Sequence, residues 1–70
     1  MTLPEIVAEN LARLMKERRY DGPTFAEAMG VTKSAVYQWL SGQGMSLANL
    51  EQAAKVLKVS VTTLVRQHKR

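Results

Sequence analysis

The 70-residue sequence contains no cysteine, so neither a disulfide nor a thiolate metal site can form. Its one histidine, His68, stands in the charged C-terminal end, where a solvated side chain is the expected state. Without a second histidine or a cysteine, neither a metal cluster nor a nucleophile with a histidine base can be assembled inside the fold. We therefore expect no enzyme, no catalytic residue, no metal or cofactor, and no small-molecule substrate.

Long apolar runs are also lacking. No segment of about 20 apolar residues is present, and the N-terminus has no basic segment followed by an apolar one, which excludes a membrane span and a signal peptide. A chain of this length makes at most one domain and buries only about 60% of the surface that it exposes when unfolded. We expect residues 1–70 to form a single soluble domain, compatible with the cytoplasm and without a membrane partner.

Acidic residues are absent between Glu27 and Glu51, although the whole chain has a net charge of +4 and a pI near 9.9. A carboxylate in that stretch would repel a DNA phosphate, whereas fixed positive charge attracts polyanions over long distances. The charge pattern therefore favours a nucleic-acid partner. The alternative explanation is that small and apolar residues simply dominate this part of the sequence.

The stretch Gly22–Gly42 predicts two short helices that meet at a tight turn. Apolar residues recur at helical spacing on both sides of Gly30: Phe25, Ala26 and Met29 before it, and Val31, Val36, Trp39 and Leu40 after it. Gly30 can adopt the left-handed conformation that ends a helix, and Thr32 stands where the N-cap of the next helix belongs. This is the pattern of a helix-turn-helix. The spacing favours a core position for Trp39 over a stacking role on single-stranded nucleic acid.

The outer face of the second of these helices is polar and carries no acid. It comprises Lys33, Ser34, Tyr37, Gln38 and Ser41. The Gln38 amide can pair with the N6 and N7 edge of adenine, and Lys33 can donate to guanine O6 and N7. For Tyr37 three roles stay open: a ring contact with a thymine methyl group, a hydroxyl contact with a phosphate, or an ordinary surface position.

The segment before this stretch also has the pattern of a helix. Residues 2–5 form a T-x-x-E capping box, which predicts a first helix that ends near residues 18–19. Asp21 is placed to cap the second helix, and Tyr20 to pack onto Phe25. The buried stripe expected on the first helix is Leu3, Ile6, Val7, Leu11, Leu14 and Met15.

Two further helices follow the central stretch. Ser46 is the expected cap of a fourth helix through Lys58, and Ser60 the cap of a fifth. The residues expected to face inward are Leu47, Leu50, Ala53, Ala54 and Leu57 on the fourth helix, and Val61, Leu64 and Val65 on the fifth. The sequence therefore predicts an all-α fold of five helices around one core.

The spacing of Ala26, Gly30, Val36 and Trp39 resembles that of the lambda-repressor-like helix-turn-helix family, the Cro and phage-repressor type. The stretch Ala53–Val65 is similar to the last two helices of that family. The resemblance implies a compact five-helix DNA-binding domain with its motif at about residues 22–42. It also implies a homodimer on a two-fold operator, with bases read by Lys33, Ser34, Tyr37 and Gln38.

One departure from the family concerns contacts with DNA phosphates. Relatives commonly place a phosphate-binding glutamine at the start of the second helix, and that position corresponds to Gly22 here. Pro23 removes a nearby backbone donor, and Asp21 adds a negative charge. We therefore expect phosphate contacts from other residues: Arg18, Arg19, Ser41, Gln43 and Gly44.

Two functions fit these observations. The first is a transcriptional regulator that binds double-stranded DNA sequence-specifically, most simply a repressor of the Cro type or the DNA-binding domain of one, in the cytoplasm and on the nucleoid. The second is a small protein-binding module, antitoxin-like or partner-binding, that keeps the fold without specific DNA readout.

Overall fold

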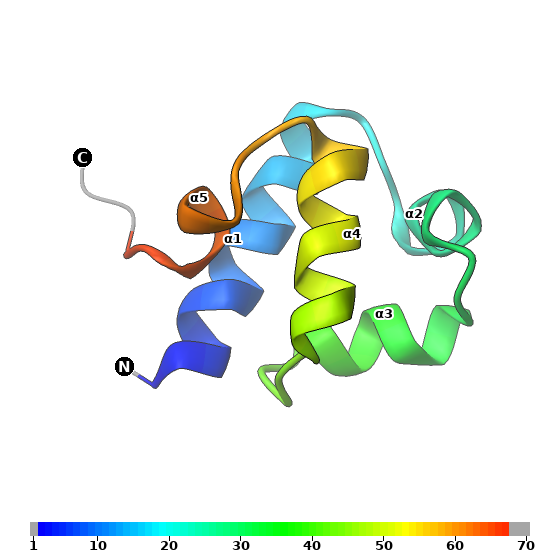
Figure 1. The fold of residues 1–70 in the computed structure, drawn as a ribbon. Helices are drawn as coiled ribbons and strands as arrows, with labels where there is room; N and C mark the ends of the chain where they lie inside the picture. Colours follow the sequence, from blue (N-terminus) through cyan, green and yellow to red (C-terminus); the bar gives the residue numbers. More distant parts are fainter. Residues whose placement is uncertain (1, 68–70) are drawn as a thin grey trace.

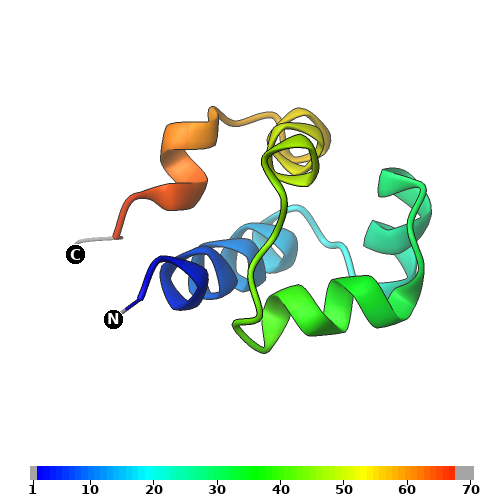
Figure 2. The same ribbon diagram turned by 60° about the horizontal axis from the view of Figure 1, so that its bottom comes forward.

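The computed structural model describes residues 2–67, which form five helices and no strand (Figure 1). The helices are α1 (Leu3–Glu17), α2 (Gly22–Met29), α3 (Lys33–Leu40), α4 (Leu47–Leu57) and α5 (Val61–Val65). α1 packs against α3 and α5, and α2 packs against α3 and α4. Figures 1 and 2 show α2 on the side of the molecule opposite the described chain ends. The all-α, five-helix prediction is confirmed.

Each helix begins at a side chain that accepts a hydrogen bond from a backbone N–H in the first turn. The five caps are Thr2, Asp21, Thr32, Ser46 and Ser60, as the sequence predicted. At α2 the cap is reciprocal: the Thr24 N–H donates to Asp21 Oδ1 at 2.8 Å, and the Asp21 N–H donates to Thr24 Oγ1 at 2.9 Å. The part that Thr24 plays in this capping box was not predicted from the sequence.

The core gathers apolar side chains from all five helices, among them the fully buried Leu11, Phe25, Val36, Leu57 and Leu64. Trp39 is 5% exposed, so its predicted core position is confirmed. Tyr20 meets Phe25 edge to face, with the ring centroids 5.5 Å apart, as expected. These contacts fix the inner faces of α2 and α3.

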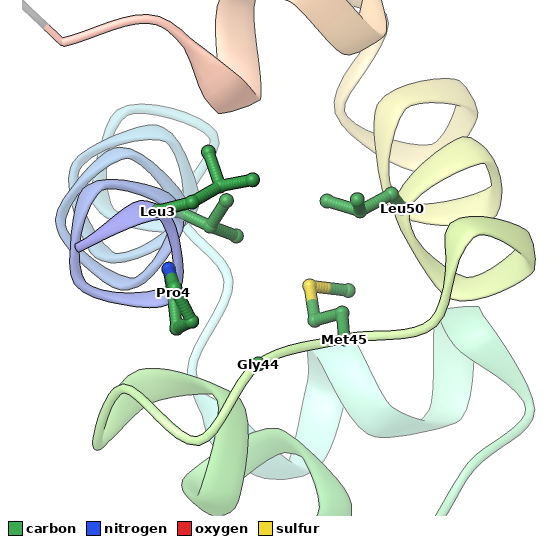
Figure 3. A pocket seen from close by; sticks show the side chains of 6 residues that line it. Leu3, Pro4, Gly44, Met45 and Leu50 are labelled. Carbon is green, nitrogen blue, oxygen red and sulfur yellow. The ribbon is translucent and has the colours of Figure 1, made fainter.

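Two residues predicted to face the core are exposed instead. Leu3 is 55% exposed and Leu47 is 67% exposed, so both predictions are wrong. Each leucine is the first residue of its helix, where the apolar stripe continues along the helix but extends past the edge of the core. Leu3 lines an apolar pocket between the starts of α1 and α4 (Figure 3), together with Pro4, Val7, Gly44, Met45 and Leu50.

A buried amide, which the apolar pattern did not indicate, ties the end of α5 to α1. Asn10 is 2% exposed, and its Nδ2 donates to the carbonyls of Leu64 and Arg66, both at 2.7 Å. Its Oδ1 accepts from Arg13 at 3.2 Å, so the whole carboxamide is satisfied. Asn10 thereby holds the C-terminal side of the described chain in place.

Two expectations from the sequence concern a membrane span and the position of His68. None of the described helices is long and apolar enough to cross a membrane. His68, which the sequence assigns to a solvated tail, lies outside residues 2–67.

The Asp21 cap predicts an acid-dependent loss of stability. Hydrogen bonds from the backbone N–H and then the hydroxyl of Thr24 hold the pKa of the Asp21 carboxyl below its ordinary value of 3.8. Asp21 therefore stabilises the fold above that value, and its contribution is lost as pH falls through the lowered pKa. Asp21→Asn retains a capping oxygen but does not titrate.

The measurement is thermal melting of both proteins from about pH 7 to about pH 2.5. We expect the wild type to be the more stable protein at neutral pH, and the difference in Tm to shrink as the pH falls below about 4. Glu9→Gln removes an exposed carboxylate that caps no helix and controls for general charge effects. A difference that stays constant with pH would contradict a charged Asp21 cap.

Candidate nucleic-acid interface

α2 and α3 meet at a turn whose geometry depends on Gly30. Gly30 has φ 73° and ψ 31°, and it ends α2 as a left-handed cap. The Val31 N–H then donates to the Ala26 carbonyl at 3.0 Å, and Thr32 Oγ1 accepts from the Ala35 N–H at 3.2 Å. The chain therefore leaves one helix and begins the next within three residues. Figure 2 shows the two helices joined at this turn.

The inner and outer faces of α3 differ sharply. Val36 and Trp39 are buried, and Leu40 is half-buried against the core. The opposite stripe is exposed along its length, and it consists of Lys33, Ser34, Tyr37, Gln38 and, at the C-cap, Ser41. The structure thus brings the four predicted base-reading residues together on one exposed, polar surface. This stripe carries no carboxylate.

The two predicted phosphate-binding arginines lie at the far end of α1 from the loop that follows α3. The Nε of Arg18 donates to the Leu57 carbonyl at 3.0 Å, so its guanidinium stabilises the C-terminus of α4. Arg19 has φ 62°, in the left-handed region, and its side chain is exposed. Arg18 therefore also holds the C-terminal ends of α1 and α4 together, a role that no pattern in the sequence predicted.

The loop after α3 contains the other predicted phosphate contacts. Ser41 Oγ donates to the Gln38 carbonyl at 2.8 Å, and the Gln43 N–H donates to the same carbonyl at 3.2 Å. The Gln43 side chain is exposed, and Gly44 has φ 88°. This loop is therefore held to the end of α3 by backbone and hydroxyl contacts.

The structure also brings an acid next to this loop. A Cβ built on Gly42 would lie 3.8 Å from Cγ of Glu5. Hydrogen bonds from the Thr2 backbone N–H and then its hydroxyl lower the pKa of the Glu5 carboxyl, so Glu5 is charged at neutral pH. The stretch between Glu27 and Glu51 is free of acids in the sequence, but its surroundings in space are not. This charge reduces the attraction of the loop for phosphate.

Tyr37 makes a contact that the sequence did not predict. Its side chain is 53% exposed, yet its ring lies over Gly22, at the first position of α2. A Cβ at Gly22 would be 2.7 Å from both Cζ and Oη of Tyr37. From the sequence, the lack of a side chain at Gly22 indicated a lost phosphate contact. In the structure, the Tyr37 ring occupies the space that a side chain at Gly22 would need.

No metal site accompanies this surface in the described part of the chain, where no three His, Cys, Asp or Glu residues are grouped to hold an ion. Two helices joined at a left-handed glycine, with the second helix buried on one face and exposed and polar on the other, define a helix-turn-helix protein. The chain belongs to the XRE-type, lambda-repressor-like helix-turn-helix family, whose model matches residues 11–64. The family predicted from the sequence is confirmed.

A solved structure shares the fold. The crystal structure of a hypothetical transcription factor, NHTF from Neisseria, has a TM-score of 0.89 with this chain at 19% sequence identity. The match covers 94% of this chain and 77% of that chain, and at this identity it shows the fold alone. No curated protein matches the sequence significantly. The family match supports a DNA-binding regulator, a kind of protein that is typically not an enzyme.

Substitutions at Arg18 and Arg19 should change the stability of the fold in opposite directions. Arg18→Ala removes a hydrogen bond to the end of α4 and should cost about 1 kcal/mol, which is about 4–8 °C in Tm. Arg19→Gly replaces a left-handed non-glycine residue and should stabilise the fold by up to about 1 kcal/mol. Thermal denaturation of the two variants decides this. Equal losses of stability would show that the two arginines have the same structural role.

Proposed function

We propose that this chain is a sequence-specific regulator of transcription that binds double-stranded DNA as a homodimer on a two-fold operator, as a Cro-type repressor does. The observation that carries the proposal is the outer face of α3, which is exposed and polar while Val36 and Trp39 hold the inner face in the core. Such a helix can enter a major groove without unfolding any part of the protein. The protein would act in the cytoplasm, associated with the nucleoid when bound.

Within this face, Lys33, Ser34 and Gln38 are assigned to base edges. All three side chains are exposed: Lys33 and Ser34 are the first two residues of α3, and Gln38 lies one turn later, in its second half. Gln38 offers a paired donor and acceptor for adenine, Lys33 a donor for guanine, and Ser34 a hydroxyl that suits several bases. Tyr37 differs from them because its ring lies against Gly22.

The phosphate contacts are assigned to residues at or beyond the ends of α3: Arg18, Arg19, Ser41, Gln43 and Gly44. Ser41, the C-cap of α3, would turn its hydroxyl from the Gln38 carbonyl to a phosphate oxygen. Arg18 uses its Nε–H on the Leu57 carbonyl, and its Nη1 lies 3.8 Å from Oε1 of Glu17, which leaves other N–H groups for a phosphate. Arg19 makes no ion pair within residues 2–67, and its whole guanidinium is therefore available. Such contacts set affinity and register without reading sequence.

The alternative is a protein-binding module without specific DNA readout. The exposed Leu3 and Leu47, and the apolar pocket that Leu3 lines (Figure 3), favour it, since exposed apolar surface serves protein contacts. The charge on Glu5 beside the loop after α3 also weakens a phosphate contact there. The acid-free, exposed face of α3 favours DNA.

The first test is the salt dependence of binding. If a dimer neutralises about 6–10 phosphates, log affinity should fall with log salt concentration at a slope of about −5 to −9. The measurement is fluorescence titration of labelled genomic fragments at several salt concentrations, with the preferred fragment found by selection. A flat response would support the protein-binding alternative.

The second test separates base contacts from phosphate contacts. Gln38→Ala should cost about 1–3 kcal/mol on the preferred operator and little on scrambled DNA, because a lost base contact removes discrimination. Arg19→Ala should weaken both targets similarly and make the salt slope shallower by about one unit. Gln52→Ala, at an exposed glutamine on α4, is the matched control and should change neither affinity. Equal losses for Gln38→Ala on both DNAs would mean that α3 does not read sequence.

A further inference from the structure

The position of the Tyr37 ring depends on the absence of a side chain at Gly22. Gly22 is buried at the start of α2, and an added Cβ would lie 2.7 Å from Cζ and Oη of Tyr37 and 2.9 Å from Cε1. Real Cβ atoms do not approach other heavy atoms below 3.0 Å, so the ring keeps this place only while residue 22 is glycine. The requirement is one of space, since Gly22 is an ordinary helical residue by its backbone.

The Tyr37 hydroxyl has no partner within residues 2–67. No hydrogen bond joins it to any described residue, although it lies close to the first residue of α2. A phenolic O–H both donates and accepts, so at a surface it binds water or an external ligand. Lys33 lies one turn earlier on the same face of α3, and its ammonium group makes no ion pair with the described residues. An anion beside Tyr37 would therefore find both a neutral donor and a nearby cation.

The start of α2 has few donors of its own for such an anion. The Asp21 carboxylate already accepts the Thr24 N–H, and Pro23 has no N–H. Asp21 also places a negative charge next to Gly22, which opposes an anion. The Tyr37 hydroxyl, which comes from α3, supplies a hydrogen-bond donor that the start of α2 lacks. The Tyr37 hydroxyl thus lies beside the first residue of α2, although its backbone belongs to α3.

We propose that Tyr37 contacts the DNA backbone, its hydroxyl donating to a phosphate beside the start of α2, and that Gly22 is the residue that positions it. This inference rests on the proposed function, and it selects the phosphate contact among the three roles that the sequence left open for Tyr37. Tyr37 is then a sequence-independent contact, and Gly22 acts only through the ring. The residue pair replaces a single phosphate-binding side chain on α2 with a tyrosine that reaches across from α3.

Two single variants and their combination test the proposal. Tyr37→Phe removes the hydroxyl and keeps the ring, while Gly22→Ala displaces the ring. Because the atoms nearest to the added Cβ are the far end of a half-exposed side chain, the ring can swing away, and the Tm of Gly22→Ala should change little. Each variant should bind operator and scrambled DNA about tenfold more weakly, as expected for a lost hydrogen bond to a charged group. The double variant should bind no more weakly than Tyr37→Phe alone, since both changes remove the same contact.

The controls separate this inference from the proposed function. Tyr20→Phe changes the other tyrosine, which packs on Phe25, and should leave both affinities unchanged. Loss confined to the operator would make Tyr37 a base reader, and an unchanged affinity for Tyr37→Phe or for Gly22→Ala would equally overturn the proposal. A wild type without salt-dependent DNA binding would refute the proposed function. The ring contact can still be verified in that case, from the NMR shift of the Gly22 Hα protons in the wild type and in Tyr37→Leu.

Discussion

The burial of Val36 and Trp39 is the constraint on which the rest of this structure depends. These side chains hold the inner face of α3 against α1 and α2, and because a helix is rigid, they also determine which residues of α3 face solvent. Gly30 makes this possible, since its left-handed conformation ends α2 close enough for α3 to turn back on it. The exposed stripe of α3 is thus a consequence of core packing.

The surroundings of α3 carry charges of both signs, and the negative ones reduce the attraction of this surface for a polyanion. α3 carries no acid, but Glu5 lies beside the loop after it and Asp21 lies beside the start of α2. Both carboxylates belong to capping boxes, Asp21 as the N-cap of α2 and Glu5 as the partner of the N-cap Thr2, and hydrogen bonds hold both pKa values low. Two negative charges that stabilise helix N-termini therefore lie near the surface proposed for DNA. Affinity should depend more on well-placed contacts than on net charge.

Arg18 and Gly22 each have a role in the fold and a role in the proposed interface. Arg18 joins the C-terminal ends of α1 and α4 while keeping donors for a phosphate. Gly22 leaves room for the ring of Tyr37, so a residue without a side chain decides where a hydroxyl lies. Such shared roles mean that stability and binding must be measured together, because a substitution at one residue also changes the position of its neighbour.

The sequence by itself determined the five helices, their caps at Thr2, Asp21, Thr32, Ser46 and Ser60, and most of the core. Helix periodicity and capping depend on residues three or four positions apart, so both can be predicted from the sequence. Only the tertiary structure decided that Leu3 and Leu47 lie beyond the edge of the core. It alone also paired residues that are distant in sequence: Asn10 with Leu64, Arg18 with Leu57, Glu5 with Gly42, and Gly22 with Tyr37. These contacts depend on how whole helices pack, and no local pattern records which distant residue will lie opposite.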